Sequence, residues 1–131
     1  MTSWLADIVV VNESSEEQTP GDVSVFRSIG GAMQWLEPWW FAEGHGTILT
    51  ASGERLSMRE SPRGYVELDR CEPDAEGERL VREWLHHKAK AILQVRRERA
   101  VKGRAILASH EKSGLLPSTV EGLIAYVGFD D

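Results

Sequence analysis

Four histidines and a single cysteine are the side chains in this sequence that could bind a transition metal or carry out nucleophilic catalysis. His86 and His87 are adjacent, so on a helix their side chains would point about 100° apart and could hardly share one metal ion. His45 and His110 stand alone, and no Cys-x-x-Cys or His-x-x-x-His spacing occurs. We therefore predict that the protein has no metal site and needs no cofactor.

Cys71 could act as a nucleophile with His45 as its base, but its neighbours in the sequence do not favour that role. Arg70 and Glu72 flank the thiol with opposite charges, so it does not stand in the electropositive surroundings that favour a thiolate. A lone cysteine at the end of a strand is more often structural. We therefore predict no catalytic role for Cys71.

Two pairs of adjacent carboxylates, Glu16-Glu17 and Asp130-Asp131, have the residue type needed for general acid–base catalysis. That chemistry requires carboxylates in a cleft, whereas these pairs fall in a polar stretch and in the last residues of the sequence. Gly44 and Gly46 form a Gly-x-Gly pair that lacks the third glycine and the following helix of a nucleotide-binding loop. We therefore predict no catalytic residues and a protein that is not an enzyme.

The densest group of large side chains is aromatic: Trp35, Trp39, Trp40 and Phe41 fall within seven positions. On a strand over residues 39–42, Trp39 and Phe41 would point to one face and Trp40 to the other. One face must join the core, and the other exposes a large ring unless a helix covers it. Because exposed tryptophan is enriched at binding hot spots, we predict Trp40, or Trp39 in its place, as the anchor for a protein partner. A strand buried on both sides is the alternative.

The charge of the chain is unevenly distributed around a net formal charge of −6. Residues 1–78 hold 15 acidic and 5 basic side chains, residues 79–112 hold 3 acidic and 10 basic ones, and residues 113–131 hold 3 acidic and no basic ones. A field of one sign speeds encounter with an oppositely charged surface, so we predict that the acidic part binds the partner. The predicted contact residues lie in and near the aromatic cluster: Trp39, Trp40, Glu43, His45, Glu54 and Glu60.

Clustered Lys and Arg side chains give residues 88–104 the electrostatic character of a phosphate-binding helix. These cations are Lys88, Lys90, Arg96, Arg97, Arg99, Lys102 and Arg104. Helical spacing spreads them over more than one face, and the acidic remainder of the chain repels a polyanion. We therefore do not expect tight binding to nucleic acid, and a solvated helix face opposite the acidic sheet is the simpler interpretation.

The elements that would position these residues begin with short β-strands. Stretches with a β-branched or alternating pattern predict strands at 4–11, 23–27, 39–42, 47–51, 54–58 and 65–69. The Ser52-Gly53 dipeptide predicts a hairpin, and the polar stretch 12–22, which contains Pro20-Gly21, predicts a loop. One short helix over residues 28–36 interrupts the strands, with Ser28 as its N-cap.

Helical patterns dominate from Asp74, which is the predicted N-cap of a long amphipathic helix. Apolar side chains recur along it at helical spacing: Leu80, Val81, Trp84, Leu85, Ile92 and Val95. Gly103 is predicted to break or bend this helix. A last helix is predicted over 118–127, where Ser118 and Glu121 form a capping box and Gly128 would be the C-terminal cap.

These elements predict one α+β domain over residues 1–131. Residues 1–72 would form a small antiparallel sheet with one short early helix, and residues 73–131 would form a mainly helical part that packs on it.

A lone cysteine can form no internal disulfide, the first basic side chain is Arg27, and the apolar runs are too short to span a bilayer. We therefore predict a cytoplasmic protein with no membrane partner.

One run of motifs in residues 23–58 has a recognisable order. Phe26-Arg27-Ser28 precedes a short helix that ends at Leu36-Glu37-Pro38, and the following hairpin carries Ala51-Ser52-Gly53-Glu54-Arg55-Leu56. This order of strand, helix, L-E-P, strand and A-x-G-x-x-L resembles small cytoplasmic immunity proteins of bacterial polymorphic or contact-dependent toxin systems. The resemblance implies a protein that binds a toxin domain and blocks it by occlusion, without catalytic residues.

Together these observations predict a non-enzymatic protein-binding protein, an immunity-type inhibitor that neutralises a cognate bacterial toxin. Two alternative functions stay open: a nucleic-acid-associated regulator that uses residues 88–104, and a small enzyme or ligand-binding domain with a pocket near Trp39, Trp40 and His45. A homodimer also stays open.

Overall fold

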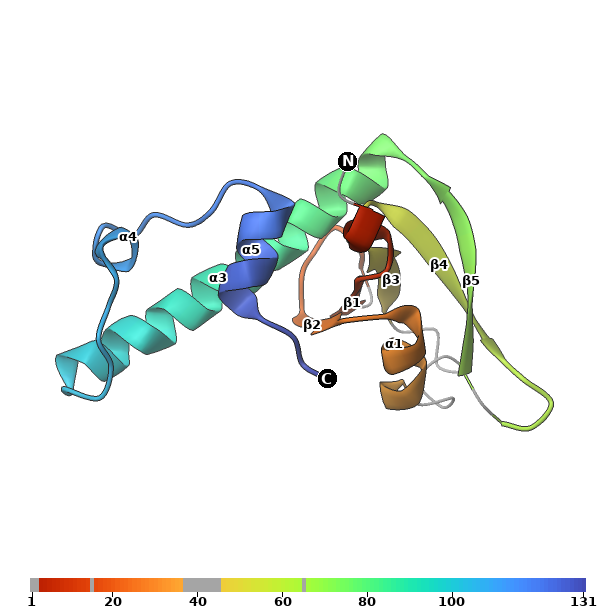
Figure 1. Cartoon of the computed structure of the whole chain (residues 1–131), viewed down its shortest axis with the longest axis horizontal. Helices are drawn as coiled ribbons and strands as arrows, with labels where there is room; N and C mark the ends of the chain where they lie inside the picture. The colour runs from red at the N-terminus through yellow and green to blue at the C-terminus, as the bar shows by residue number, and fades with distance from the viewer. Residues whose placement is uncertain (1–2, 15, 37–45, 65) are drawn as a thin grey trace.

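The computed structural model describes residues 3–14, 16–36, 46–64 and 66–131 (Figure 1). Within these residues one antiparallel sheet has the strand order β2-β1-β3-β4-β5. Its strands are β1 (Val9–Glu13), β2 (Asp22–Phe26), β3 (Thr47–Thr50), β4 (Glu54–Glu60) and β5 (Val66–Pro73). The described helices are the 3-10 helix η1 (Ser3–Ala6) and the α-helices α1 (Ile29–Trp35), α3 (Ala75–Val101), α4 (Ser109–Lys112) and α5 (Val120–Val127). The predicted α+β class is confirmed.

Helices cover both faces of the sheet. Val10 of β1 faces the side where Trp84 of α3 and Leu123 of α5 complete one apolar cluster. Val9 and Val11 face the other side, where the core includes Ala32 of α1. Because successive side chains of a strand point to opposite faces, the aliphatic run of β1 is buried on both sides, which explains why its sequence does not alternate with polar residues.

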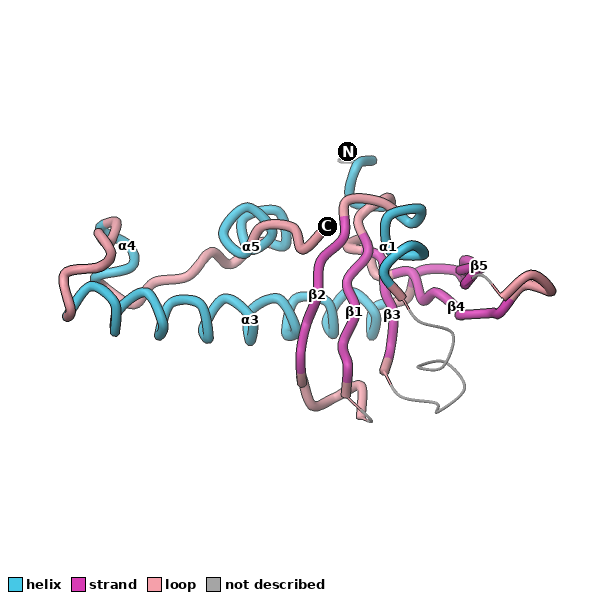
Figure 2. Tube along the Cα trace, turned by 90° about the horizontal axis from the view of Figure 1, so that it is seen from below, coloured by secondary structure: helices cyan, strands magenta, loops and turns pink. Residues whose placement is uncertain are grey.

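The long helix α3 packs on the sheet with its first part only and then extends beyond it (Figures 1 and 2). Asp74 is its N-cap, as predicted, and the Asp74 carboxylate accepts a hydrogen bond of 2.5 Å from the backbone N–H of Gly77. Every buried side chain of α3 lies at or before Leu93. The helix ends before Gly103, whose φ of 71° is the left-handed conformation that favours glycine.

The hairpin predicted at Ser52-Gly53 joins β3 to β4 and packs against the first turn of α3. Gly53 has a φ of 95°, which a turn of this kind needs and which other residues rarely adopt. A Cβ atom placed on Gly77 would overlap the carbonyl oxygen of Gly53. The backbones of the hairpin and the helix can therefore approach this closely only because position 77 has no side chain.

The last residues of the described chain cover the outer edge of β2. The backbone N–H of Asp130 donates to the carbonyl oxygen of Val25 (2.7 Å), and the Val25 N–H donates to the Asp130 carboxylate (2.7 Å). The backbone N–H of Arg27 donates to the Asp131 carboxylate at 3.1 Å. The edge of β2 is therefore satisfied by the Asp130 and Asp131 carboxylates, the Asp130 backbone and the Lys88 side chain rather than by a further strand.

Several element boundaries differ from the predicted ones. The predicted first strand begins only at Val9, because residues 3–6 form η1. The predicted loop begins later, because Asn12 stays in the sheet opposite Val23 and its side chain accepts a hydrogen bond from the Gly21 N–H (2.8 Å).

The N-cap of the last helix was predicted one residue too early. Thr119, not Ser118, caps α5, and its hydroxyl accepts a hydrogen bond of 3.1 Å from the N–H of Gly122. A Cβ atom on Gly122 would lie 2.7 Å from Cβ of Pro117, so close packing of the proline fixes where the helix begins. Gly128 caps the other end, as predicted.

The strand predicted over residues 39–42 lies outside the described residues. Helix α4 was not predicted at all. Among the described helices, none combines the length and the apolar character needed to cross a membrane.

Candidate partner-binding surface

The part of the chain that leaves the sheet forms an arm, which we call the distal arm and define as residues 94–118. It comprises the end of α3, the turn at Gly103, α4 and the segment that leads to α5 (Figure 1). Since the sheet does not support these residues, other interactions must hold them in place.

A buried carboxylate, Glu111, holds the distal arm together, and only 3% of this residue is exposed. Its oxygens accept hydrogen bonds from Arg96 Nε (2.5 Å) and Nη2 (3.0 Å). They also accept hydrogen bonds from the Tyr126 hydroxyl (2.7 Å) and the Ala108 backbone N–H (3.0 Å). One side chain of α4 is thereby linked to both α3 and α5.

The electrostatics of this cluster follow from its donors. Hydrogen bonds from Arg96, the Ala108 N–H and Tyr126 lower the pKa of Glu111 to about 2. Burial, with the hydrogen bond to Glu111, raises the pKa of Tyr126 to about 12. Glu111 is therefore ionised and Tyr126 is neutral at physiological pH. In these states the Glu111 carboxylate accepts its strongest hydrogen bonds from Arg96 and from the Tyr126 hydroxyl.

Three of the seven cations in the basic stretch 88–104 bond to groups within the chain. Arg96 binds Glu111, and Arg97 donates to the backbone carbonyls of Glu111 (3.2 Å) and Lys112 (3.1 Å). Lys88 donates to the Val23 carbonyl (2.6 Å) and pairs with the carboxylate of Asp130 (3.0 Å). These three side chains therefore stabilise the fold, which the sequence alone did not indicate.

The other four cations of that stretch are exposed: Lys90, Arg99, Lys102 and Arg104. None of them forms an ion pair within the described part of the chain. Residues 99–110 contain no carboxylate at all. The turn that follows Glu98 at the end of α3 therefore carries Arg99, Lys102 and Arg104 with no carboxylate among residues 99–110.

Exposed apolar side chains lie among these free cations. Of the seven large apolar residues that are exposed in the described chain, four belong to the distal arm: Val95, Val101, Ile106 and Leu115. Val101 is 89% exposed and Ile106 is 93% exposed. Four exposed apolar side chains within residues 94–118 make the distal arm the candidate for an interaction surface.

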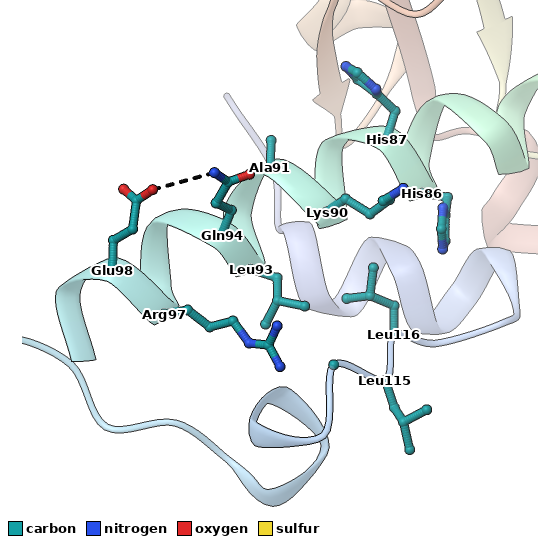
Figure 3. Close-up of a pocket in the computed structure, with 11 residues that line it drawn as sticks. His86, His87, Lys90, Ala91, Leu93, Gln94, Arg97, Glu98, Leu115 and Leu116 are labelled. Atoms are coloured by element: carbon teal, nitrogen blue, oxygen red, sulfur yellow. Dashed lines mark hydrogen bonds between the residues drawn. The ribbon is translucent and has the colours of Figure 1, made fainter. Parts of the chain in front are cut away.

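A groove runs between α3 and the segment 114–118 (Figure 3). One part, with a volume of about 870 Å³, lies beside Leu93, Arg97 and Leu115. A second part, about 470 Å³, continues toward the sheet. Both parts are lined by His86, His87, Lys90 and Leu116, so they form one continuous surface depression.

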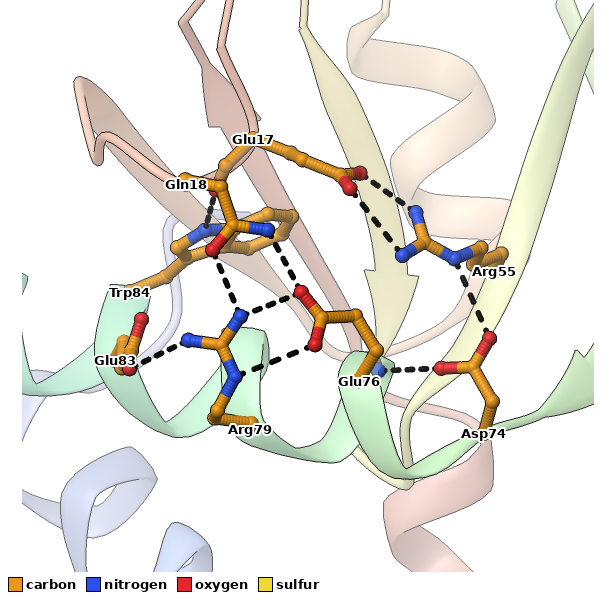
Figure 4. A network of polar contacts seen from close by, with 9 residues as sticks. Glu17, Gln18, Arg55, Asp74, Glu76, Arg79, Glu83 and Trp84 are labelled. Atoms are coloured by element: carbon orange, nitrogen blue, oxygen red, sulfur yellow. Dashed lines mark hydrogen bonds and ion pairs between the residues drawn. The ribbon is translucent and has the colours of Figure 1, made fainter.

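Several carboxylates of the acidic part of the chain are paired with arginines. A polar network links the connection between β1 and β2 to the start of α3 (Figure 4), with Arg55 bound to Glu17 at 2.6 Å. Arg79 pairs with both Glu76 (2.5 Å) and Glu83 (2.7 Å). On the β4–β5 hairpin, the arginine at position 59 pairs with the carboxylates at positions 67 and 69. These carboxylates therefore contribute less free negative charge than the sequence suggests.

Four of the six predicted partner-binding residues, Trp39, Trp40, Glu43 and His45, lie outside the described residues. Glu54 begins β4; its side chain is 17% exposed and its carboxylate lies 3.5 Å from Arg70 Nε. Glu60 ends the same strand, so the two positions are separated by about 20 Å of extended chain. The structure therefore does not bring Glu54 and Glu60 together.

The described histidines and the cysteine lie on three elements, α3, α4 and β5. His86 and His87 are exposed on α3, and His110 is exposed on α4. Cys71 is exposed on β5, with its sulfur 3.8 Å from the hydroxyl of Ser57. Across the described residues, no group of three or more His, Cys, Asp or Glu side chains is arranged to hold a metal ion.

Sequence reasoning did not identify the residues that make the distal arm a candidate interface. Ile106 and Leu115 lie outside any helical or strand pattern, so periodicity gave no reason to select them. The absence of carboxylates from residues 99–110 was the signal that could have drawn attention to this surface.

Comparisons with protein-family models, curated proteins and solved structures find no match to this chain. Its function is therefore inferred from the residues and their geometry.

Proposed function

We propose that this chain is a non-enzymatic protein-binding protein whose distal arm contacts the partner. The observation that carries the proposal is the exposure of Val101 and Ile106, 89% and 93%, on an arm braced by the buried carboxylate of Glu111. A partner that covers these side chains removes apolar surface from water. Because the bonds of Glu111 already link α4 to α3 and α5, less entropy is lost in ordering the arm on binding.

A protein partner accounts for this surface better than nucleic acid does. Phosphate binding depends on the number of cations presented together, and Lys88, Arg96 and Arg97 are bonded within the chain. Apolar side chains such as Val101 and Ile106 add nothing to phosphate contacts. They suit a partner with apolar side chains surrounded by carboxylates.

The more specific proposal is an immunity-type inhibitor that binds a cognate bacterial toxin in the cytoplasm and blocks it by occlusion. The resemblance of residues 23–58 to such proteins supports it. β2, α1 and the β3–β4 hairpin follow one another in the order of that motif. An inhibitor of this kind needs no active site. It does need a rigid surface, and the distal arm braced by Glu111 is a surface of that kind.

The test begins with identification of the partner by co-purification with the tagged chain, followed by measurement of the dissociation constant. Changing both Val101 and Ile106 to Asp should weaken binding by about tenfold or more, since hot-spot side chains contribute on this scale. The matched control is Ala125→Asp, which adds a carboxylate at an exposed position of α5 outside the arm. The control should bind as the wild type does.

The acidic surface predicted from the sequence is the competing interface. If Trp40→Ala, or the pair Glu43→Lys and Glu54→Lys, abolishes binding while the arm variants bind normally, the distal arm is not the interface. If no protein partner is found and the chain binds a random DNA duplex with submicromolar affinity in about 0.15 M salt, the protein-binding function itself is wrong.

A further inference from the structure

The groove between α3 and the segment 114–118 is long enough to hold a segment of another protein. Its α3 side extends from Arg82 to Glu98, which is about 24 Å at the helical rise of 1.5 Å per residue. That length accommodates about seven residues of extended chain or about four helical turns.

The floor of the groove is apolar and its position is fixed. Leu93 of α3 is buried, and Leu116 packs against the core from the opposite side. Leu115 is 64% exposed beside them, although its backbone N–H is bound to the carbonyl of His110 (2.9 Å). Gly114 adopts a φ of 75° to make this turn. Leu115 is therefore held at the groove by the end of α4.

Three cations lie along the groove at regular intervals. Arg82, Lys90 and Arg97 line it from α3, and their separations of eight and seven residues correspond to about two helical turns each. Figure 3 shows Lys90 and Arg97 on the side of α3 that faces Leu115 and Leu116. The bonds of Arg97 to backbone carbonyls leave its positive charge unneutralised.

Two carboxylates, Glu83 and Glu98, also line the groove, one toward each end. Glu83 is bound to Arg79 at 2.7 Å, and Glu98 lies at the distal end, where Gln94 donates to it (3.4 Å). Among the described lining residues, Lys90 in the middle of the groove therefore has no carboxylate beside it and lies above an apolar floor.

We propose that this groove binds an acidic segment of the partner protein. Apolar side chains of that segment cover Leu93, Leu115 and Leu116, while its carboxylates lie against Lys90 and the arginines at either end. Complementary charge fixes the position of the segment and speeds its association, and the leucines supply the desolvated contact that holds it. The proposal rests on the protein-binding function argued above and adds the chemistry of the partner.

The probe for this proposal is a library of random 16-residue peptides displayed on phage and selected against the full chain. We expect enriched peptides that combine several Asp or Glu residues with large apolar side chains. The most enriched peptide is then synthesised with a fluorescent label, and its dissociation constant is measured by anisotropy.

Two variants test where that peptide binds. Lys90→Glu reverses one groove charge, and Leu115→Ser removes an exposed apolar contact; both positions are exposed, so the fold should not change. Each should weaken binding by about tenfold. The matched control is Arg63→Glu, which also replaces a cation by a carboxylate, at an exposed position of the turn between β4 and β5, outside the distal arm and the groove. It should stay within about twofold of the wild type.

The proposal is overturned if no peptide is enriched, if the enriched peptides are not acidic, or if both groove variants bind them as the wild type does. Displacement of the peptide by a DNA duplex or by anionic vesicles at about 0.15 M salt, with the same loss in Lys90→Glu, would assign the groove to that ligand instead. If the co-purified partner depends on Val101 and Ile106 but not on Lys90, the groove proposal fails while the proposed function stands.

Discussion

Gly77, in the first turn of α3, is a position where helix propensity and backbone packing predict opposite effects of the same substitution. Propensity alone favours Gly77→Ala, because alanine is about 1 kcal/mol more favourable than glycine within a helix. In the folded chain, however, the added methyl group would overlap the carbonyl oxygen of Gly53 and lie 3.2 Å from the Asp74 carboxylate. Overpacking of this kind costs about 1–3 kcal/mol.

The upper end of that range applies here because the added methyl group would meet a backbone atom, the carbonyl oxygen of Gly53, rather than a flexible side chain. Gly53 has a φ of 95° in a tight hairpin, so its carbonyl cannot move without distorting the junction of β3 and β4. A cost of about 3 kcal/mol, less about 1 kcal/mol from propensity, leaves a net loss of about 2 kcal/mol in the free energy of unfolding. Urea denaturation followed by circular dichroism measures this value.

The matched control is Gly30→Ala in α1. A Cβ atom there would lie 3.9 Å from the Ser28 hydroxyl, which is an ordinary contact, so the variant should be neutral or more stable by up to about 1 kcal/mol. If Gly77→Ala is as stable as the wild type, the close approach of hairpin and helix described above is wrong.

Three further predictions concern the distal arm and the core. The folded-state pKa of Glu111 is lowered to about 2, so the stability it contributes should be present above its unfolded pKa and should be lost as the pH falls toward 2. Between pH 5 and pH 2, the urea midpoint of unfolding should therefore fall more for the wild type than for Glu111→Gln. Parallel pH profiles of the two midpoints would contradict the stabilising role of the ionised Glu111 carboxylate. Leu123 is 1% exposed, so Leu123→Ala should destabilise the chain by about 2–5 kcal/mol, while the exposed Ala125→Ser should change the melting temperature little. The chain should bind a random DNA duplex more weakly than micromolar in about 0.15 M salt, and submicromolar binding by filter assay would show that the free cations suffice for nucleic acid.

Local chemistry in the sequence was enough to predict most elements of the fold. Ser28 and Asp74 each precede a helix and cap it as predicted, because a side-chain oxygen at this position satisfies a free backbone N–H. Ser52-Gly53 predicted the hairpin because glycine readily adopts a positive φ. These features depend on a few neighbouring residues, so the sequence is sufficient to reveal them.

The distal arm could not be predicted in the same way. Helix α4 has four residues and depends on the contact between Glu111 and Arg96, which are 15 positions apart. Such a short helix is not stable by itself, so neither its existence nor the burial of Glu111 leaves a local pattern. For the same reason the sequence could not separate cations that bind within the chain, such as Lys88, from those that remain free.

The cover over the edge of β2 has a consequence for self-association. An open edge strand presents a row of unpaired backbone groups on which a second chain can add a strand, and this is a common route to aggregation. Here the carboxylates of Asp130 and Asp131 accept the N–H groups of Val25 and Arg27, and Lys88 binds the carbonyl of Val23. A dimer or fibril that paired two β2 strands would first have to break these bonds and desolvate the charges that make them.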